Sequence, residues 1–144
     1  MREILFRGKV RGNYNDYHSV VKDKGWLYGD LHIGNAIYID GDEWRLRVEP
    51  ETVGQFTGLL DNNGNKIFEG DIVRFYEVLG QHGIMDPFKF KGVVKYGYGY
   101  YYVEYINERN LKGKWNLSSC WHLEVVGNIH DNGDLYKEIK GEIK

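Results

Sequence analysis

The 144-residue sequence has little cysteine, little proline and no excess of charge. Its single cysteine, Cys120, cannot form a disulfide within the chain, which is typical of proteins from a reducing compartment such as the cytosol. The formal net charge of −2 gives the chain no basic field that would attract nucleic acid. No apolar run approaches the roughly 20 residues that a membrane-spanning helix needs, and Met1-Arg2-Glu3 opens no signal peptide. We therefore expect a cytoplasmic protein with no membrane partner.

The residues that are abundant favour β-structure. There are 19 glycines and 12 tyrosines but only 2 prolines. Glycine is common in turns because it adopts positive φ easily, and aromatic residues fit the pleated, half-buried surface of a sheet. The length is that of one domain with a substantial core. The composition predicts a mostly β domain with little helix.

The strongest local pattern is a β-hairpin within residues 55–75. Apolar residues lead into five consecutive turn formers, Asp61-Asn62-Asn63-Gly64-Asn65, and residues 66–68 return as a strand. A second bend follows at residues 69–71, and Ile72-Val73-Arg74-Phe75 is rich in β-branched and aromatic residues. Two turns that bracket a short strand predict a meander.

The rest of the chain reads as further strands joined by polar loops. We expect strands at residues 2–9, 26–33, 36–39, 44–48, 90–96, 100–106, 115–117 and 121–126. The expected loops are residues 10–25, with a short helical turn near 17–22, and residues 80–87 and 107–114. A short helical turn can begin at Pro50. Leu135, Ile139 and Ile143 repeat every four residues, which predicts a surface helix over residues 135–144 that Gly141 weakens.

Groups that could carry catalysis are isolated along the sequence. The five histidines occur singly, without the spacing of a zinc site. Cys120 and His122 could share a face of a strand, but a lone cysteine is more often a small buried hydrophobe than a nucleophile. The glycine-rich segments spell neither of the common phosphate-binding loops. We predict no catalytic residue, no metal ligand and no cofactor.

A run of aromatic and basic residues is the best candidate for binding. Tyrosines crowd residues 96–105, and lysines and an arginine lie in neighbouring strands of the expected sheet. Aromatic side chains interleaved with bases can stack on single-stranded nucleic acid. The alternative, favoured by the neutral overall charge, is that the tyrosines pack against their cross-strand neighbours. The candidate binding residues are Arg74, Lys91, Lys95, Tyr98 and Tyr100.

Five segments together resemble one family. They are REILFRG at residues 2–8, WLYG at 26–29, TVGQFTGL at 52–59, DNNGNKIFEGDIV at 61–73 and VGNIHDN at 126–132. The chain thereby resembles the YopX-type proteins of phages and prophages. The resemblance implies a β-rich fold with an SH3-like barrel portion and an origin in a bacteriophage or integrated element, and it supplies no catalytic residues.

These observations predict an N-terminal β lobe at residues 1–50, an SH3-like barrel lobe at residues 51–134 and a tail at residues 135–144. The first functional hypothesis is a phage accessory protein of the bacterial cytoplasm that acts by binding a protein partner or a second copy of itself, because β-rich domains have edge strands that can pair. A second is a nucleic-acid-binding module that uses the tyrosine and lysine face. A third is an enzyme whose site is assembled from residues distant in sequence.

Overall fold

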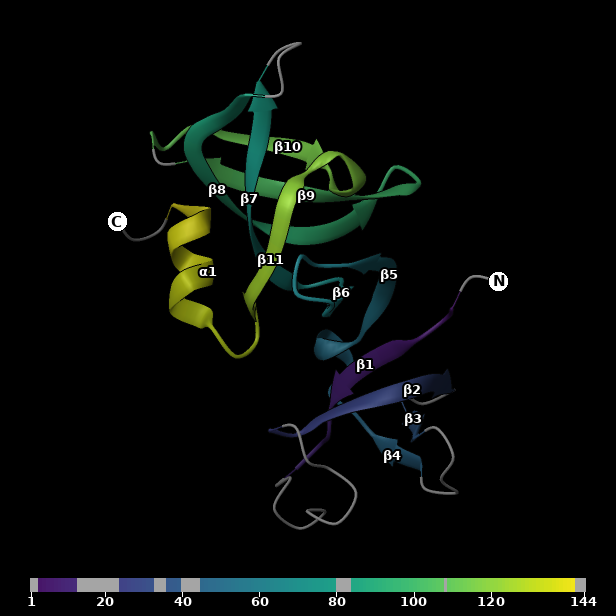
Figure 1. Ribbon diagram of the computed structural model, residues 1–144. Coiled ribbons are helices and arrows are strands. Elements are labelled where there is room, and N and C mark those ends of the chain that lie inside the picture. Colours follow the sequence, from purple (N-terminus) through teal and green to yellow (C-terminus); the bar gives the residue numbers. More distant parts are fainter. Residues whose placement is uncertain are drawn as a thin grey trace. The chain divides into compact units, whose positions relative to one another are not determined.

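The computed structural model describes residues 3–12, 24–32, 36–39, 45–79, 84–107 and 109–141. The helical turn predicted near residues 17–22 lies outside these ranges. The chain forms two compact units, residues 1–58 and residues 59–144. Both are built from antiparallel β-sheet (Figure 1).

The sheet of the first unit runs in the order β4-β3-β2-β1-β5. Its strands are β1 (Phe6–Lys9), β2 (Trp26–His32), β3 (Ala36–Ile39), β4 (Arg45–Arg47) and β5 (Gly54–Leu60). The predicted first strand is thus too long, since residues 3–5 have no regular structure. The short turn predicted after Pro50 is confirmed as the 3-10 helix η2 (Pro50–Thr52). Val10, Leu27, Ile37 and Val48 form this unit's core.

In the second unit, consecutive strands lie side by side and the last one returns to the first. The sheet has the order β10-β9-β8-β7-β11, with every pairing antiparallel. Its strands are β7 (Asp71–Leu79), β8 (Ile84–Gly97), β9 (Tyr100–Asn107), β10 (Lys112–Asn116) and β11 (Trp121–Asn128). The 3-10 helix η3 (Leu117–Ser119) precedes β11, and β6 (Lys66–Phe68) lies beside the end of β5.

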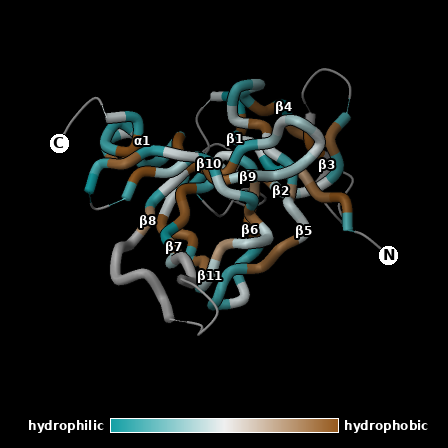
Figure 2. Tube along the Cα trace, turned by 90° about the horizontal axis from the view of Figure 1, so that it is seen from above, coloured by the Kyte–Doolittle hydropathy of each residue, from teal (hydrophilic) through white to brown (hydrophobic). Residues whose placement is uncertain are grey.

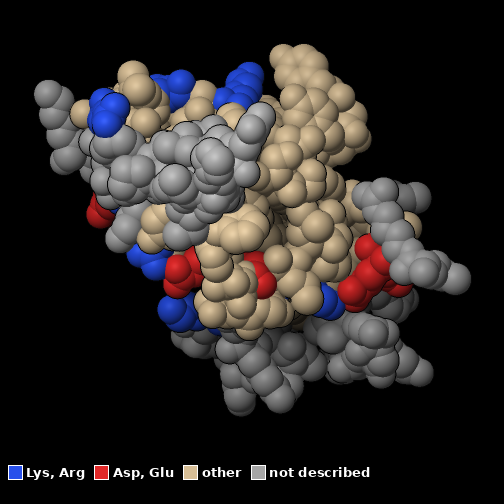
Figure 3. All heavy atoms as spheres, turned by 45° about the horizontal axis from the view of Figure 1, so that its top comes forward, with Lys and Arg blue, Asp and Glu red and all other residues tan. Residues whose placement is uncertain are grey.

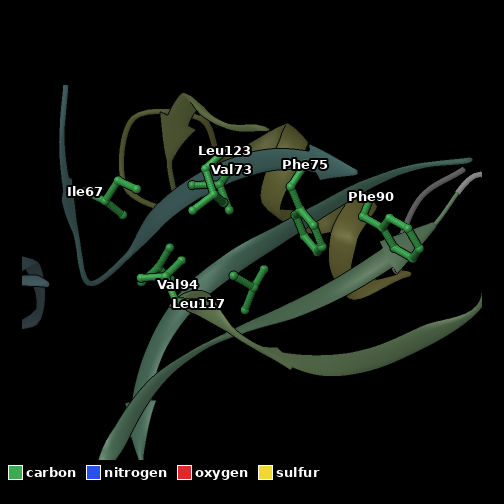
Figure 4. Close-up of a cluster of buried hydrophobic side chains, with 8 residues drawn as sticks. Ile67, Val73, Phe75, Phe90, Val94, Leu117 and Leu123 are labelled. Carbon is green, nitrogen blue, oxygen red and sulfur yellow. The ribbon is translucent and has the colours of Figure 1, made fainter. Parts of the chain in front are cut away.

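One face of this sheet carries the main core of the second unit. Side chains from six parts of the chain converge there, as Figure 4 shows. Three aromatic rings pack at its centre: Phe75 and Phe90 lie stacked with centroids 5.2 Å apart, and Tyr105 meets both rings edge-on. Hydrophobic and hydrophilic segments succeed one another along the strands (Figure 2). The fully or nearly buried members are Ile67, Val73, Phe75, Phe90, Val94, Val103, Leu117 and Leu123.

The opposite face is partly covered by the one α-helix of the described residues, α1 (Gly133–Lys140). Ile139 of α1 is buried against Ile72 and Val93 of the sheet. The predicted tail helix is therefore confirmed, but its bounds differ: it begins two residues earlier than residue 135 and ends at Lys140 instead of residue 144. Gly141 does not weaken its interior: it is the left-handed C-cap at φ 80°, and its N–H bonds back to the last turn.

Two predicted loops are wrong in part. Residues 84–87 of the expected loop 80–87 belong to β8, and residues 112–114 of the expected loop 107–114 belong to β10. In both cases pairing with a neighbouring strand overrides a polar, turn-rich local sequence. Leu117 is also not in a strand, because η3 begins there. The mostly β fold with little helix is confirmed, and closure of the second sheet into an SH3-like barrel stays a prediction.

Candidate binding surface at the tyrosine hairpin

The hairpin between β8 and β9 ends in a turn of two residues. Gly97 pairs with Tyr100, which leaves Tyr98 and Gly99 as the turn. Both turn residues have positive φ, 57° and 84°, as a two-residue hairpin with a right-handed strand twist requires. Glycine adopts this conformation at no steric cost, whereas a β-carbon in the left-handed region costs about 1–2 kcal/mol. Tyr98 therefore holds a backbone conformation that its side chain disfavours.

The side chain of Tyr98 is turned to solvent, with 84 % of its surface exposed. The ammonium of Lys114 lies 5.8 Å from the centre of its ring and 5.5 Å from the ring of Tyr102. Tyr100 continues the group, with its ring centroid 5.9 Å from that of Tyr102. We call these four residues the tyrosine surface. It combines one cation with three aromatic rings at the end of a hairpin. Only the rings of Tyr98 and Tyr100 are exposed, whereas Tyr102 is buried.

The other tyrosines of the run belong to the opposite face. Tyr101 and Tyr105 pack against the main core, and Tyr96 lies beside Tyr101 with their rings 4.9 Å apart. The alternation of β9 thus sends Tyr100 and Tyr102 to one side and Tyr101 to the other. Packing accounts for Tyr101 and Tyr105. It does not account for Tyr98, which is the most exposed of the large hydrophobic side chains described.

The three predicted cations share the sheet face of Tyr100, but each is paired with a carboxylate. Arg74 lies opposite Lys91 in the register, and Lys95 lies opposite Tyr102. The N···O distances to their partners are 2.5 Å for Arg74 to Glu124, 3.3 Å for Lys91 to Glu138 and 3.2 Å for Lys95 to Glu104. The hydrogen bond that the Arg74 guanidinium donates to Glu124, together with the negative charge of that carboxylate, raises the pKa of Arg74.

These pairs leave little net positive charge on the face. Lys91 also stands six residues before Gly97 along β8, which is about 20 Å at the rise of a strand. The five candidate residues therefore form two groups, one beside α1 and one at the hairpin end. On the side of the molecule in Figure 3, basic and acidic atoms are interspersed among uncharged ones and form no continuous basic field.

The sequence pattern missed Lys114, because residues 107–114 read as a loop. In the structure Lys114 lies in β10 opposite Glu104, on the face of the tyrosine surface. The signal in the sequence is Lys112-Gly113-Lys114-Trp115-Asn116, in which polar residues alternate with Gly113 and Trp115. Its exposure alternates in the same way.

Cys120 and His122 do not form a reactive pair in this geometry. The Cys120 thiol lies 3.5 Å from the backbone oxygen of Asn116, and burial raises its pKa to about 12. His122 has a φ of 52° within an irregular stretch of β11 and turns its ring edge-on to Trp121. The thiol is therefore protonated at neutral pH, the form in which it is a poor nucleophile.

Within the described ranges, no three His, Cys, Asp or Glu side chains come close enough together to hold a metal ion. Nor does any helix among the described residues have the length and apolar character to cross a membrane.

A comparison with curated proteins finds no match. The family model described as "YopX protein" matches residues 11–137, which is most of the chain. It includes the central hairpin and all strands of the second unit. The chain therefore belongs to the YopX protein family.

Proposed function

We propose that this protein is a non-enzymatic binding module and that the tyrosine surface contacts a protein partner. The observation that carries the proposal is Tyr98, a large aromatic residue that is 84 % exposed at a left-handed turn position. Asparagine or glycine would fit this turn better, because both tolerate positive φ. Strained and exposed residues of this kind are concentrated at functional sites.

A protein partner fits the surface better than nucleic acid does. Tyrosine is enriched at the centres of protein interfaces, where it contributes a large rigid area with one polar end. Binding to nucleic acid draws most of its strength from unpaired cations that neutralise phosphates. Here Arg74, Lys91 and Lys95 already face carboxylates.

Nucleic-acid binding is the second candidate, and one arrangement favours it. Lys114 lies over two tyrosine rings, so a base stacked on Tyr98 or Tyr100 would have a cation beside it. If this candidate is right, Tyr98→Ala and Tyr100→Ala each weaken binding of a labelled single-stranded oligonucleotide by about 1–3 kcal/mol. Binding would also fall steeply as salt is raised.

The biological setting follows from the family resemblance. We propose an accessory protein of a phage or an integrated element, located in the cytoplasm of the bacterial host. We also propose that the second unit is the SH3-like portion. The support is the strand order, in which four consecutive strands form a meander and β11 returns beside β7 after the 3-10 turn η3.

The test is site-specific photo-crosslinking in cells that carry the phage or element. A photoreactive phenylalanine derivative replaces Tyr98 in one variant and Asn63, an exposed residue at the tip of the other hairpin, in a control. The proposal expects discrete protein adducts from position 98 and none from position 63. Adducts to nucleic acid at position 98 would establish the second candidate. Equal adducts from both positions, or none from position 98, would overturn the proposal.

A further inference from the structure

The strand β10 has one edge that no described strand covers. It ends the order β10-β9-β8-β7-β11, and β9 is its only neighbour among the strands that the structure describes. In an antiparallel pair, residues that exchange both backbone hydrogen bonds alternate with residues that exchange none. One bond in the loop before β10 shows which residues belong to which class. The Asn107 N–H donates to the Leu111 carbonyl at 3.0 Å, so Asn107 and Leu111 are a hydrogen-bonded pair.

From that closing pair the alternation can be followed along β10. Gly113, opposite Tyr105, lies two residues after Leu111, and Trp115, opposite Val103, lies two residues further. The backbone N–H and C=O groups of Gly113 and Trp115 therefore point towards β9. Lys112, Lys114 and Asn116 are the residues between, and their N–H and C=O groups point away from β9. The Asn116 carbonyl agrees with this direction, because it accepts from the Cys120 thiol, which is not part of β9.

The open edge is positively charged. Lys112 and Lys114 are both exposed, and β10 contains no acidic residue. The Lys112 ammonium donates to the backbone oxygen of Lys140 at the end of α1. Lys114 has no carboxylate within ion-pair distance among the described residues, and its ammonium lies over two tyrosine rings.

A second copy of β10 is a poor occupant for this edge. An antiparallel pair centred on Lys114 would place Lys114 opposite Lys114, and one centred on Gly113 would place Lys112 opposite Lys114. Like charges directly opposite each other on neighbouring strands are destabilising. Lysines on an edge strand are indeed a common device against such self-pairing.

We propose that β10 receives an extended acidic segment of a partner protein as an additional strand of the sheet. The backbone groups of Lys112 and Lys114 supply the hydrogen bonds of strand addition. Acidic side chains at alternate positions of the added strand lie on the sheet face of the two lysines and pair with them. The inference rests on the proposed function and names the chemistry of the partner: an extended chain with a carboxylate at every second residue.

The first experiment leaves the protein unchanged. A labelled peptide of about eight residues, alternating glutamate and threonine, is titrated with the full chain and followed by fluorescence anisotropy. A peptide alternating lysine and threonine is the charge control. Two further glutamate peptides carry backbone N-methyl groups, one on the glutamates and one on the threonines. Because the N–H groups at successive residues point to opposite edges of a strand, one of these two peptides keeps its bonding edge and the other loses it.

We expect the unmethylated glutamate peptide and one of the methylated peptides to bind, and the other methylated peptide and the lysine peptide to bind at least tenfold more weakly. Equal binding of the two methylated peptides would overturn strand addition. Equal binding of the glutamate and lysine peptides would overturn the acidic partner.

Two variants locate the site. Lys114→Thr removes the charge alone and should weaken glutamate-peptide binding about two- to fivefold, as expected for an exposed ion pair. Lys114→Pro also removes the outward N–H, and proline is tolerated at an edge where that N–H faces solvent. We expect it to bind several-fold more weakly than Lys114→Thr, and equal binding by the two variants would overturn the inference. If no peptide binds while position 98 still crosslinks to a protein, this inference fails and the proposed function stands.

Discussion

The two outer strands of the second sheet differ in how their edges are finished. The edge of β11 is covered by the turn of the central hairpin: the Asn62 N–H donates to the Leu123 carbonyl at 2.7 Å, and the Val125 N–H donates to the Asp61 carboxylate at 3.0 Å. The edge of β10 has no such cover from the described residues, and it carries lysines instead. One edge is closed by hydrogen bonds within the chain, and the other is left open and charged.

This difference assigns a role to each turn. The carboxylate of Asp61 is buried, and its first oxygen also accepts from the N–H groups of Asn63 and Asn65, so it organises its own hairpin while it covers a strand 64 residues later. The turn at Tyr98 and Gly99 covers no strand edge within the described ranges, and it exposes an aromatic ring. The Asp61 turn stabilises the sheet, whereas the Tyr98 turn has a tyrosine at a positive-φ position that favours asparagine or glycine. The Asp61 turn therefore holds the sheet together, whereas the Tyr98 turn is the one that we propose for binding a partner.

The largest expected effect is the opening of the closed edge. Asp61→Ala removes the acceptor of three backbone N–H groups, one of them on β11, so we expect the free energy of unfolding to fall by about 2–4 kcal/mol. Urea denaturation measures this loss. The control is Asn63→Ala in the same turn, whose exposed side chain should cost less than about 0.5 kcal/mol. Equal losses in the two variants would mean that the turn's shape, and not the carboxylate, closes the edge.

The same carboxylate makes the closed edge sensitive to acid. Burial alone would raise the pKa of Asp61, but hydrogen bonds from Val125, Asn65 and Asn63 outweigh it, so the pKa lies below its ordinary value of 3.8. A lowered pKa in the folded state means that the stabilisation is complete above that ordinary value and is lost as the pH falls through the lower, folded value. Urea denaturation between neutral and strongly acidic pH should show a shallower loss of stability below the ordinary value for Asp61→Asn than for the unaltered chain. The same acid dependence in both proteins would assign it to other carboxylates.

Proline tests both edges in the same way, with a smaller effect. Val125→Pro removes an N–H that is bonded to Asp61, whereas Lys114→Pro removes one that points to solvent. Each proline variant is compared with the alanine variant at the same position, so that the cost of losing the original side chain is subtracted. The proline-minus-alanine cost should be about 1–3 kcal/mol larger at position 125 than at position 114, as expected for a lost hydrogen bond whose acceptor is left unpaired. Thermal or urea unfolding measures both differences, and similar costs would contradict the contrast between the edges.

Local patterns in the sequence were sufficient to predict several elements of both units. Residues 61–65 read as a turn because each suits one, and η2 followed from Pro50. The strand at residues 36–39 and the existence of a helix near the end of the chain, predicted over residues 135–144 and found at Gly133–Lys140, likewise rest on strong local signals. These are β-branched residues in the first case and a four-residue spacing in the second.

What the sequence did not reveal depends on contacts between distant segments. Residues 112–114 form a strand only because β9 pairs with them, and the role of Asp61 on β11 joins positions 64 residues apart. The candidate cations Arg74, Lys91 and Lys95 were identified by charge, but a sequence pattern does not show that each meets a carboxylate from another element or strand. The left-handed φ of Tyr98 was also hidden, because the neighbouring glycines, Gly97 and Gly99, suggest that they absorb the turn.

The smallest expected effect concerns the Tyr98 turn and has the opposite sign. Tyr98→Asn places an Asn-Gly pair in a turn with two positive φ values, the combination that such hairpins favour. Asparagine keeps a β-carbon but tolerates positive φ, so it relieves part of the backbone strain of about 1–2 kcal/mol. It also loses a Lys114 contact of about 0.5–1 kcal/mol, so the free energy of unfolding should rise by no more than about 0.5 kcal/mol.

The control is Tyr100→Asn, at a strand position where asparagine is disfavoured, which should lower stability instead. Urea denaturation distinguishes the two signs. Partner binding by Tyr98→Asn is then tested with the photoreactive phenylalanine derivative placed at position 100. If this chain is more stable but gives no protein adduct, while the same derivative in the chain with Tyr98 does, then tyrosine is kept at this turn for binding. A loss of stability in Tyr98→Asn would show that the ring stabilises the hairpin, and the reason to place the binding surface there would be gone.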